Sequence, residues 1–249
     1  MAVSEPAPGA PAAVPHEERP ARFMVIVAHP DDADFGVAGT AARWIDAGSV
    51  GALVCLTSGD AGGDDAGVDP LELARTREEE QRWAAAIVGY VEVTFLHQPD
   101  GALANDLAVR EQLVQRIRAF RPDAVMTNDP TVLFHEDGYV NHADHRAAGM
   151  AAVDAVYPAA RNPMAFPHLV RAGLAPHRVE ALYLFGTDRP GAWVDITATL
   201  ERKTEALRRH RSQFADPDDL VRRVQEWAEE DGAAIGVPAA EAFRLVRPG

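Results

Sequence analysis

The segment FMVIVAHPDD, residues 23–32, gives the first indication of how this chain folds. Its apolar start, Phe23 to Val27, is typical of a buried strand. The polar string His29-Pro30-Asp31-Asp32 follows directly, so an imidazole and two carboxylates stand where that strand ends. Open α/β sheets bind their ligands at the carboxyl ends of the strands. The segment therefore predicts an α/β sheet with polar functional groups at one edge.

From residue 23 onward, short apolar runs alternate with helical patterns, which favours a mostly parallel sheet covered by helices on both faces. The expected strands are 23–28, 52–57, 92–96, 124–127, 181–185 and 193–196. The expected helices cover 36–47, 70–88, 107–120 and 220–230. Another helix should start at His142, and one more, capped by Asp195 or Thr197, should end near Gln213. We thus predict a Rossmann-like α/β fold with residues 22–249 as one domain, preceded by a flexible tail over 1–21.

A second string, His142-Ala143-Asp144-His145, lies far along the chain at the start of a helical pattern. Side chains three residues apart, such as His29 and Asp32, can converge on one metal ion, and His145 could supply a third ligand. Two His and one Asp make a zinc site with a free coordination position, where the metal lowers the pKa of water to about 7. Taken alone, either string could be a turn or a helix cap. Together they predict a hydrolytic metal site at the carboxyl ends of the strands.

The composition argues against several classes of partner. At pH 7 the 249-residue chain carries a formal net charge of −14, which disfavours nucleic acid and an anionic membrane surface. No apolar stretch approaches the length that spans a bilayer, and the start of the chain lacks the features of a signal peptide. The single cysteine, Cys55, cannot form an internal disulfide. We therefore expect a cytoplasmic protein that acts on a small molecule, as a monomer or a homo-oligomer.

These motifs resemble those of the LmbE-like/PIG-L family of zinc-dependent de-N-acetylases, which includes the mycothiol-pathway deacetylase and amidase. The resemblance covers about Arg22 to Gln213, and its motifs follow the family order. The matching pieces are Ala28–Asp32, Phe35-Gly36, Gly39-Thr40, Thr57–Asp60, Arg77 with Glu80, Pro99–Gly101 and His142–His145. The paired histidine strings are specific, whereas the Gly-Asp and Pro-Asp-Gly pieces are individually weak.

The resemblance implies a metal centre with a base beside it. His29, Asp32 and His145 would hold one zinc ion, or another divalent metal such as Fe²⁺. Asp31, which matches the first aspartate after the proline, would act as the general base on the attacking water. The fold that the resemblance implies is the same parallel α/β sheet.

The resemblance also implies roles for four residues around that centre. His142 would stabilise the oxyanion or protonate the departing amine, and Asp144 would orient His142 by a hydrogen bond. Asp144 is equally placed to cap the helix that begins there. Arg77 and Asp100 match family positions that contact polar groups of the substrate. As alternatives, Arg77 could lie on a solvated, ion-paired helix face, and Asp100 could be only a turn residue.

Two features depart from the usual family pattern. Many members carry Glu directly after the paired aspartates, where this chain has Ala33 and then Asp34, so Asp34 is the candidate replacement for a supporting carboxylate. Ala143 stands where proline is common. Tyr139 is close enough to the second string to donate a hydrogen bond to the oxyanion, or else to pack under a loop.

Other polar and aromatic residues are expected to lie outside the chemistry. We expect solvent rather than ligand around His97, His135, His168, His177 and His210, with a position facing the substrate as the alternative for His135 in its irregular loop. We expect the tryptophans, Trp227 among them, to pack rather than to stack on sugars. The proline-rich stretch 157–178 is expected to form loops near the mouth of the site.

The sequence thus predicts hydrolysis of an N-acyl bond on a polar small molecule, most simply an N-acetylated amino sugar. The nearest alternative is an amidase for a thiol conjugate or a natural-product intermediate, and another is a metal-binding protein without catalysis. A nucleotide-binding protein on the same sheet is disfavoured, because His-Pro-Asp-Asp occupies the turn where Gly-x-Gly-x-x-Gly would stand.

Overall fold

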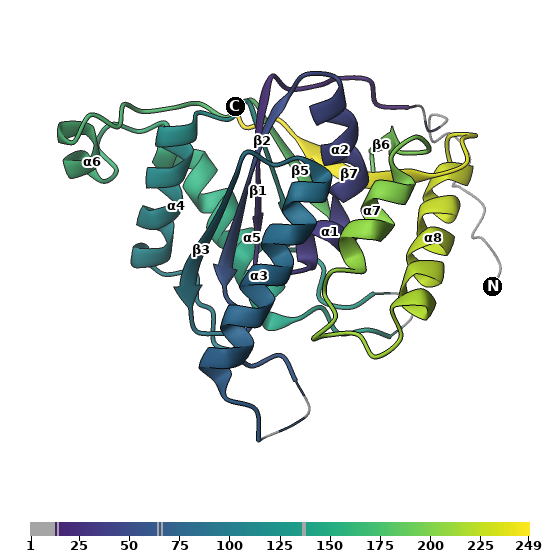
Figure 1. Cartoon of the computed structure of the whole chain (residues 1–249). Coiled ribbons are helices and arrows are strands. Elements are labelled where there is room, and N and C mark those ends of the chain that lie inside the picture. Colours follow the sequence, from purple (N-terminus) through teal and green to yellow (C-terminus); the bar gives the residue numbers. More distant parts are fainter. Residues whose placement is uncertain (1–12, 14, 64, 66, 136–137) are drawn as a thin grey trace.

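A twisted sheet forms the middle layer of the protein (Figure 1). The computed structural model describes residues 13, 15–63, 65, 67–135 and 138–249. Within them the strands are β1 (Arg22–Val27), β2 (Val50–Thr57), β3 (Glu92–Gln98), β4 (Ala124–Asn128), β5 (Ala181–Phe185), β6 (Ala192–Asp195) and β7 (Ala240–Val246). Their order in the sheet is β3-β2-β1-β4-β5-β7-β6, and β7 runs antiparallel to its two neighbours while the pairs among β1 to β5 are parallel. The predicted mostly parallel α/β fold is confirmed.

Helices cover both faces of this sheet (Figure 1). They are α1 (Asp32–Gly36), α2 (Ala38–Asp46), α3 (Pro70–Val88), α4 (Leu107–Phe120), α5 (Ala143–Asp154), the π-helical turn η1 (Ala155–Ala160), α6 (Pro167–Arg171), α7 (Leu200–Leu207) and α8 (Pro217–Ala233). Buried residues of α1, α2, α3 and α7 share one core cluster, and buried residues of α4, α5 and η1 share another. α8 packs against β7, β6 and α7.

From Phe23 onward, the sequence of β1 is apolar throughout rather than alternating because both faces of the strand are buried. Phe23, Val25 and Val27 belong to the core cluster on the face that α1 to α3 cover. Met24 and Ile26 belong to the cluster on the opposite face, against α4 and α5. All five side chains are at most 2% exposed, as expected for a central parallel strand that is buried on both sides.

The strand order also fixes where a ligand can bind. The chain passes from β1 to β2 on one side and reaches β4 on the other side of β1, so the direction of winding reverses between β1 and β4. In such sheets the crevice at the reversal, beyond the carboxyl ends of the strands, is the usual ligand site. The segment after β1 begins with His29, and the segment after β4 leads to His142 and His145.

Local signals place several helices correctly. α3 begins at Pro70 behind the N-cap residue Asp69, and it stops at Gly89, whose φ of 104° favours glycine. The helix expected over 36–47 is instead two helices, α1 and α2, separated at Val37. α1 begins earlier than expected because the turn that follows β1 passes directly into a helix.

The C-terminal third differs more from expectation. Thr199 is the N-cap residue of α7, and α7 ends at Leu207 rather than near Gln213. The chain leaves the helix there and brings His210 into a buried contact with Asp34 of α1. β7 lies outside the expected strands, and its charged Glu241 is buried beside Lys203, so the segment lacks the apolar pattern of a core strand.

The stretch 157–178 does not lie near the mouth of the site, so the expectation placed on it is wrong. It forms the end of η1, the short helix α6 and connecting turns, and α6 lies at the upper left in Figure 1, away from the lower edge where the strands end. Within the described parts of the chain, this stretch contributes nothing to the lining of the cavity at the site. Its position follows the crossover between η1 and β5, which no local pattern reveals.

The expected tail over 1–21 falls mostly outside the described residues, which exclude 1–12 and 14. From Pro15 the chain contacts the sheet: the His16 backbone N–H donates to the Trp193 carbonyl at 2.6 Å, and His16 Nε2 lies 2.9 Å from the Tyr183 hydroxyl. The segment before β1 is therefore attached to the fold earlier than residue 22. That residues 22–249 form one domain stays a prediction.

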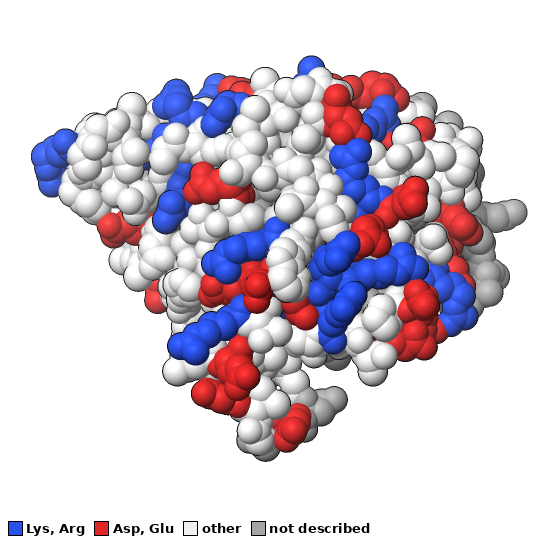
Figure 2. All heavy atoms as spheres, in the orientation of Figure 1, with Lys and Arg blue, Asp and Glu red and all other residues white. Residues whose placement is uncertain are grey.

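On the face shown in Figure 2, charges of both signs are interspersed rather than gathered in one field. Figure 2 shows acidic and basic side chains mixed over the face that α3 and α7 present. Among the helices that the structure describes, none is long and apolar enough to cross a bilayer.

The close approach of α5 to β4 yields a stability prediction. A Cβ atom at Gly149 would lie 2.3 Å from the carbonyl oxygen of Asn128. We expect Gly149→Ala to lower the free energy of unfolding by about 1–3 kcal/mol, as overpacking does, although alanine is the better helix former. Urea denaturation measures the change. Gly191→Ala is the control, because a Cβ there meets no atom within 4 Å; an unchanged stability of Gly149→Ala would contradict the close contact.

Candidate active site

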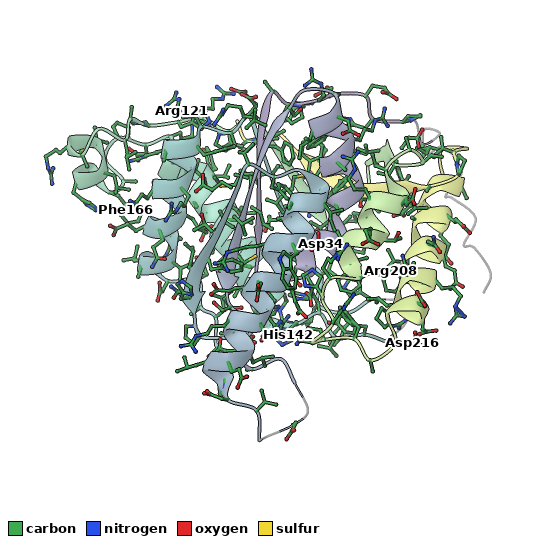
Figure 3. The ribbon with its side chains drawn as sticks, in the orientation of Figure 1. Asp34, Arg121, His142, Phe166, Arg208 and Asp216 are labelled. Carbon is green, nitrogen blue, oxygen red and sulfur yellow. The ribbon has the colours of Figure 1, made fainter. Side chains whose placement is uncertain are left out.

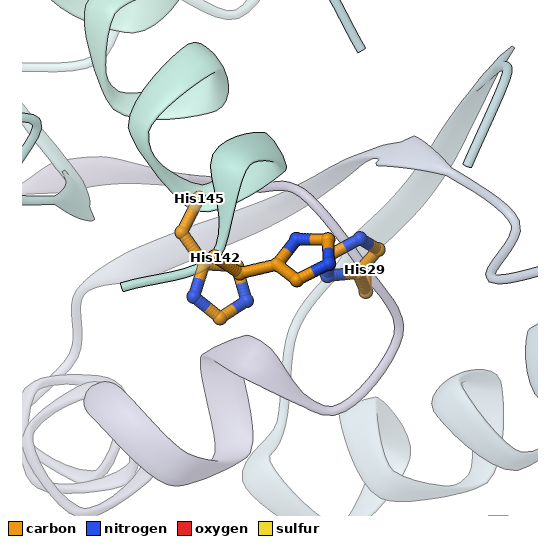
Figure 4. A group of neighbouring side chains, drawn as sticks. All are labelled: His29, His142 and His145. Atoms are coloured by element: carbon orange, nitrogen blue, oxygen red, sulfur yellow. The ribbon is translucent and has the colours of Figure 1, made fainter. Parts of the chain in front are cut away.

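Three imidazoles from distant parts of the chain meet at the carboxyl edge of the sheet. His142 lies at this lower edge in Figure 3, and Figure 4 shows it beside His29 and His145. The ring centroids are 5.1 Å apart for His29 and His142, 5.2 Å for His29 and His145, and 5.4 Å for His142 and His145. All three rings line one cavity of about 660 Å³. The two predicted strings therefore share a site.

The turn after β1 is held in an unusual backbone conformation. Asp31 has a φ of 97°, in the left-handed region of backbone space that residues other than glycine rarely adopt. Its backbone N–H donates to Gln81 Oε1 at 2.7 Å. Asp32 Oδ2 accepts from the backbone N–H groups of Ala28 and His29 at 3.1 and 2.9 Å. These hydrogen bonds offset the strain and aim two adjacent carboxylates in different directions.

The structure brings the three predicted metal ligands together. Asp32 Oδ1 lies 3.0 Å from His145 Nε2, and Asp32 Oδ2 lies 3.6 Å from His29 Nδ1. Among the described residues, the groups whose ligand atoms all lie within 4.8 Å of one another are instead His29 with His142 and His145, and His29 with Asp100 and Asp144. Imidazole nitrogens and carboxylate oxygens are the donors that suit zinc and related divalent metals. The donor set therefore fits the implied metal.

Arg77 holds the second carboxylate, that of Asp31. Its guanidinium donates to Asp31 Oδ2 at 3.2 Å, to the Pro30 carbonyl at 2.8 Å and to the Gly59 carbonyl at 3.0 Å. The side chain is only 5% exposed, so the solvated helix face considered above is wrong for Arg77. Gly59 is required where it stands, since a Cβ would lie 2.5 Å from the guanidinium and the backbone φ is 70°.

A buried network of hydrogen-bonded side chains lies behind Asp31. Two of its members, Gln81 and His210, were not expected from the sequence. Gln81, one helical turn after Arg77, also donates to Asp34 Oδ2 at 2.9 Å. His210 Nε2 lies 2.8 Å from the same oxygen, and neither the His210 nor the Asp34 side chain is exposed. In Figure 3 Asp34 lies between α3 and α7. Instead of being solvated, His210 is thus linked through Asp34 and Gln81 to the backbone of Asp31.

Asp144 differs from its predicted roles. Its carboxylate accepts from the backbone N–H groups of Gly101 and Leu103 at 2.7 and 3.2 Å and lies 3.4 Å from His29 Nε2. The cap of α5 is His142 itself, whose Nδ1 accepts from the Asp144 backbone N–H at 3.2 Å. The Asp144 carboxylate thus fastens the 101–103 turn to α5 and contacts His29, and the hydrogen bond between Asp144 and the His142 ring comes from the Asp144 backbone N–H instead.

Asp100 is more than a turn residue. Its Oδ1 lies 3.0 Å from His29 Nε2, and its Oδ2 accepts from the Ala61 backbone N–H at 2.9 Å. It lines the cavity together with Tyr139 and His135, whose rings are 5.7 Å apart on the loop that follows β4. The Tyr139 side chain is exposed at the cavity rather than packed under a loop.

Burial and mutual charge shift the pKa values at this site. Burial raises the pKa of Asp31 to about 6, although the Arg77 guanidinium acts in the opposite direction. Burial alone would also raise the pKa of Asp32, but His145 and His29 hold it well below its usual value. Burial alone would lower the pKa of His29, whereas hydrogen bonds with carboxylates raise it to about 11. A divalent cation would compete with these imidazole protons, because metal ligands bind deprotonated.

Comparison with known proteins agrees with this geometry. The family model described as PIG-L: GlcNAc-PI de-N-acetylase matches residues 24–156, which include both histidine strings. Diacetylchitobiose deacetylase of Thermococcus kodakarensis is 35% identical over 199 residues, covering 80% of this chain and 72% of that protein. The 1D-myo-inositol 2-acetamido-2-deoxy-alpha-D-glucopyranoside deacetylase 2 of Saccharopolyspora erythraea is 30% identical over 241 residues, covering 82% of this chain and 88% of that protein.

A solved structure extends the likeness to the whole fold. N,N'-diacetylchitobiose deacetylase from Pyrococcus horikoshii, in complex with its inhibitor MPG, superposes with a TM-score of 0.84 at 31% identity, over 92% of this chain and 84% of that one. Motif order, fold and sequence identity all lead to one assignment. This chain belongs to the PIG-L family of de-N-acetylases.

Proposed function

We propose that this protein is a zinc-dependent N-deacetylase that removes the acetyl group from a small molecule containing N-acetylglucosamine. The observation that carries the proposal is the pairing of a buried carboxylate, Asp31, with three imidazoles in one cavity. The relatives named above act on N-acetylated sugars. An amide bond in that cavity would lie between a proton acceptor, Asp31, and a proton donor, His142.

The proposed metal ligands are His29, Asp32 and His145, and the proposal is supported by the contacts that Asp32 makes with His145 Nε2 at 3.0 Å and with His29 Nδ1 at 3.6 Å. When bound, zinc would supply Lewis acidity that polarises the amide carbonyl and acidifies water. Asp32 is well suited to the task because its second oxygen is fixed by the backbone N–H groups of Ala28 and His29. That support holds the carboxylate in place before a ligand arrives.

Asp31 is proposed as the general base. It lines the cavity, and Arg77 binds one of its oxygens, so the carboxylate is oriented and still able to accept a proton. It takes one proton from the water that adds to the amide carbonyl carbon. The C–N bond then breaks, a proton goes to the nitrogen, and the free amine and acetate leave.

His142 is proposed to stabilise the oxyanion or to protonate the amine. It is the most exposed of the three imidazoles, and only its Nδ1 is engaged, as acceptor from the backbone N–H of Asp144. With Nδ1 accepting a hydrogen bond, Nε2 carries the proton and can donate it into the cavity. Arg77 and Asp100 line the same cavity, and their contacts with the substrate stay a prediction.

Metal removal tests the function directly. Purified protein should contain zinc and should release amine from N-acetylglucosamine compounds in a fluorescence assay for primary amines. Dialysis against a chelator should abolish release, and zinc should restore it. A protein that binds stoichiometric metal but releases amine from no N-acetylated sugar or thiol conjugate would instead be a metal-binding protein without catalysis.

Two variants separate the base from the metal ligands. Asp31→Asn should retain zinc, as measured by elemental analysis, and should lose about 10²- to 10⁴-fold in kcat, because the proton acceptor is gone. His29→Ala should lose zinc itself. Wild-type turnover in Asp31→Asn would remove Asp31 from the role of base.

A third variant tests the support behind Asp31. Gln81→Leu removes the acceptor for the Asp31 backbone N–H, and Gln81 itself does not line the cavity. We expect kcat to fall roughly 10- to 100-fold with little change in KM, because a displaced catalytic group lowers turnover more than binding. Gln115→Leu, at an exposed position on α4, is the control. An unchanged kcat in Gln81→Leu would show that the turn keeps its shape without this contact.

A further inference from the structure

The cavity extends well beyond the histidines. Its far part, which we call the aromatic arm, lies between α1, the end of β5, and the segment from Phe214 through α8. The arm is lined by Phe35, Phe185, Phe214, Val224, Trp227 and Ala228. In Figure 3 the segment between Arg208 and Asp216, which leads into this wall, runs along the same lower edge as His142. The arm and the proposed catalytic groups therefore share one continuous space.

Several aromatic side chains of the arm are partly exposed rather than fully packed in the core. Trp227 is 52% exposed, and Phe35 and Phe214 are only partly buried, with ring centroids 5.6 Å apart in an edge-to-face arrangement. Large apolar side chains that face a concave space in this way mark a binding surface for an apolar group. Trp227 thus lies on a half-exposed helix face, and that face borders the cavity.

The charged groups at the base of the arm are occupied with one another. Lys203 Nζ donates to Glu241 Oε1 at 2.5 Å and to the Phe35 carbonyl at 2.6 Å. Both Glu241 oxygens also accept backbone N–H groups, from Gly39 at 3.0 Å and from Thr40 at 2.8 Å. Asp231 is the remaining carboxylate there, and burial raises its pKa to about 6. A second sugar, with several hydroxyls to satisfy, would find few free partners in this arm.

We propose that the aromatic arm binds an apolar aglycone of the substrate, so that the physiological substrate is an N-acetylglucosaminide of a hydrophobic alcohol or phenol. This rests on the proposed deacetylase function. The acyl group of that reaction is an acetyl, which is confined to the neighbourhood of Asp31 and the histidines. The group that reaches the arm must therefore belong to the amine side of the amide, where the glycosidic oxygen provides the attachment.

Three glycosides test the proposal. We would compare kcat/KM of the zinc-loaded protein for the methyl and phenyl β-glycosides of N-acetylglucosamine and for N,N'-diacetylchitobiose. The phenyl glycoside should exceed the methyl glycoside by about tenfold, mainly through KM, because a phenyl ring is buried in the arm. It should also exceed the disaccharide.

Variants then locate the effect. Trp227→Ala and, separately, Phe214→Ala should bring the phenyl-to-methyl ratio of kcat/KM close to one, and Trp227→Phe should keep most of it. Trp83→Ala is the matched control, because Trp83 is 54% exposed on α3 and lies outside the cavity lining. It should leave the ratio at the wild-type value.

Each contrary result has a distinct meaning. A ratio near one in the wild-type protein, a preference for the disaccharide, or a ratio that Trp227→Ala leaves unchanged would overturn the aglycone proposal. Preference for a long N-acyl chain that depends on Trp227 would overturn it as well. If no glycoside is deacetylated, the proposed function fails, and calorimetric binding of the phenyl glycoside to wild type and Trp227→Ala still decides whether the arm holds the aglycone.

Discussion

The left-handed backbone at Asp31 is the constraint on which the site depends. A φ of 97° is costly for an aspartate, by about 1–3 kcal/mol, and persists only where the surroundings fix it. Here Gln81 binds the amide N–H of this residue, while Arg77 binds its carboxylate and the preceding carbonyl. Both carboxylates line the cavity, but that of Asp31 contacts Arg77, while that of Asp32 contacts His145 and the backbone N–H groups of Ala28 and His29. This turn thus gives two neighbouring carboxylates different partners, which suits the separate roles proposed for them.

Holding that turn requires charged groups to be buried, and the fold pairs them. Arg77 lies against Asp31, and His210 lies against Asp34, with all of these side chains nearly or fully removed from solvent. Breaking such a pair leaves an uncompensated buried charge, which is strongly destabilising. The elements that supply the partners, α3 and the segment after α7, come from opposite parts of the chain. Stability of the fold and geometry of the site are therefore coupled through the same contacts.

Much of the fold and of the site could be predicted because the signals are local. α3 and α4 have their expected bounds, since each begins behind an aspartate cap and ends at a residue with positive φ. The histidine strings identify themselves by spacing and residue type. Gln81 and His210 could not be found in this way, because their importance depends on which helices pack together. The same is true of β7, whose buried Glu241 looks like a surface residue in the sequence.

Most of the aromatic arm comes from a part of the chain that the family model does not cover. The model ends at residue 156, whereas Phe185, Phe214 and Trp227 come later. The residues proposed for the bond-breaking step, among them Asp31 and His142, lie within the matched range, whereas most of the proposed aglycone surface lies after it. Family membership therefore carries information on the histidine strings, whereas the proposed aglycone selectivity has to be derived from α8 and its neighbours in each chain.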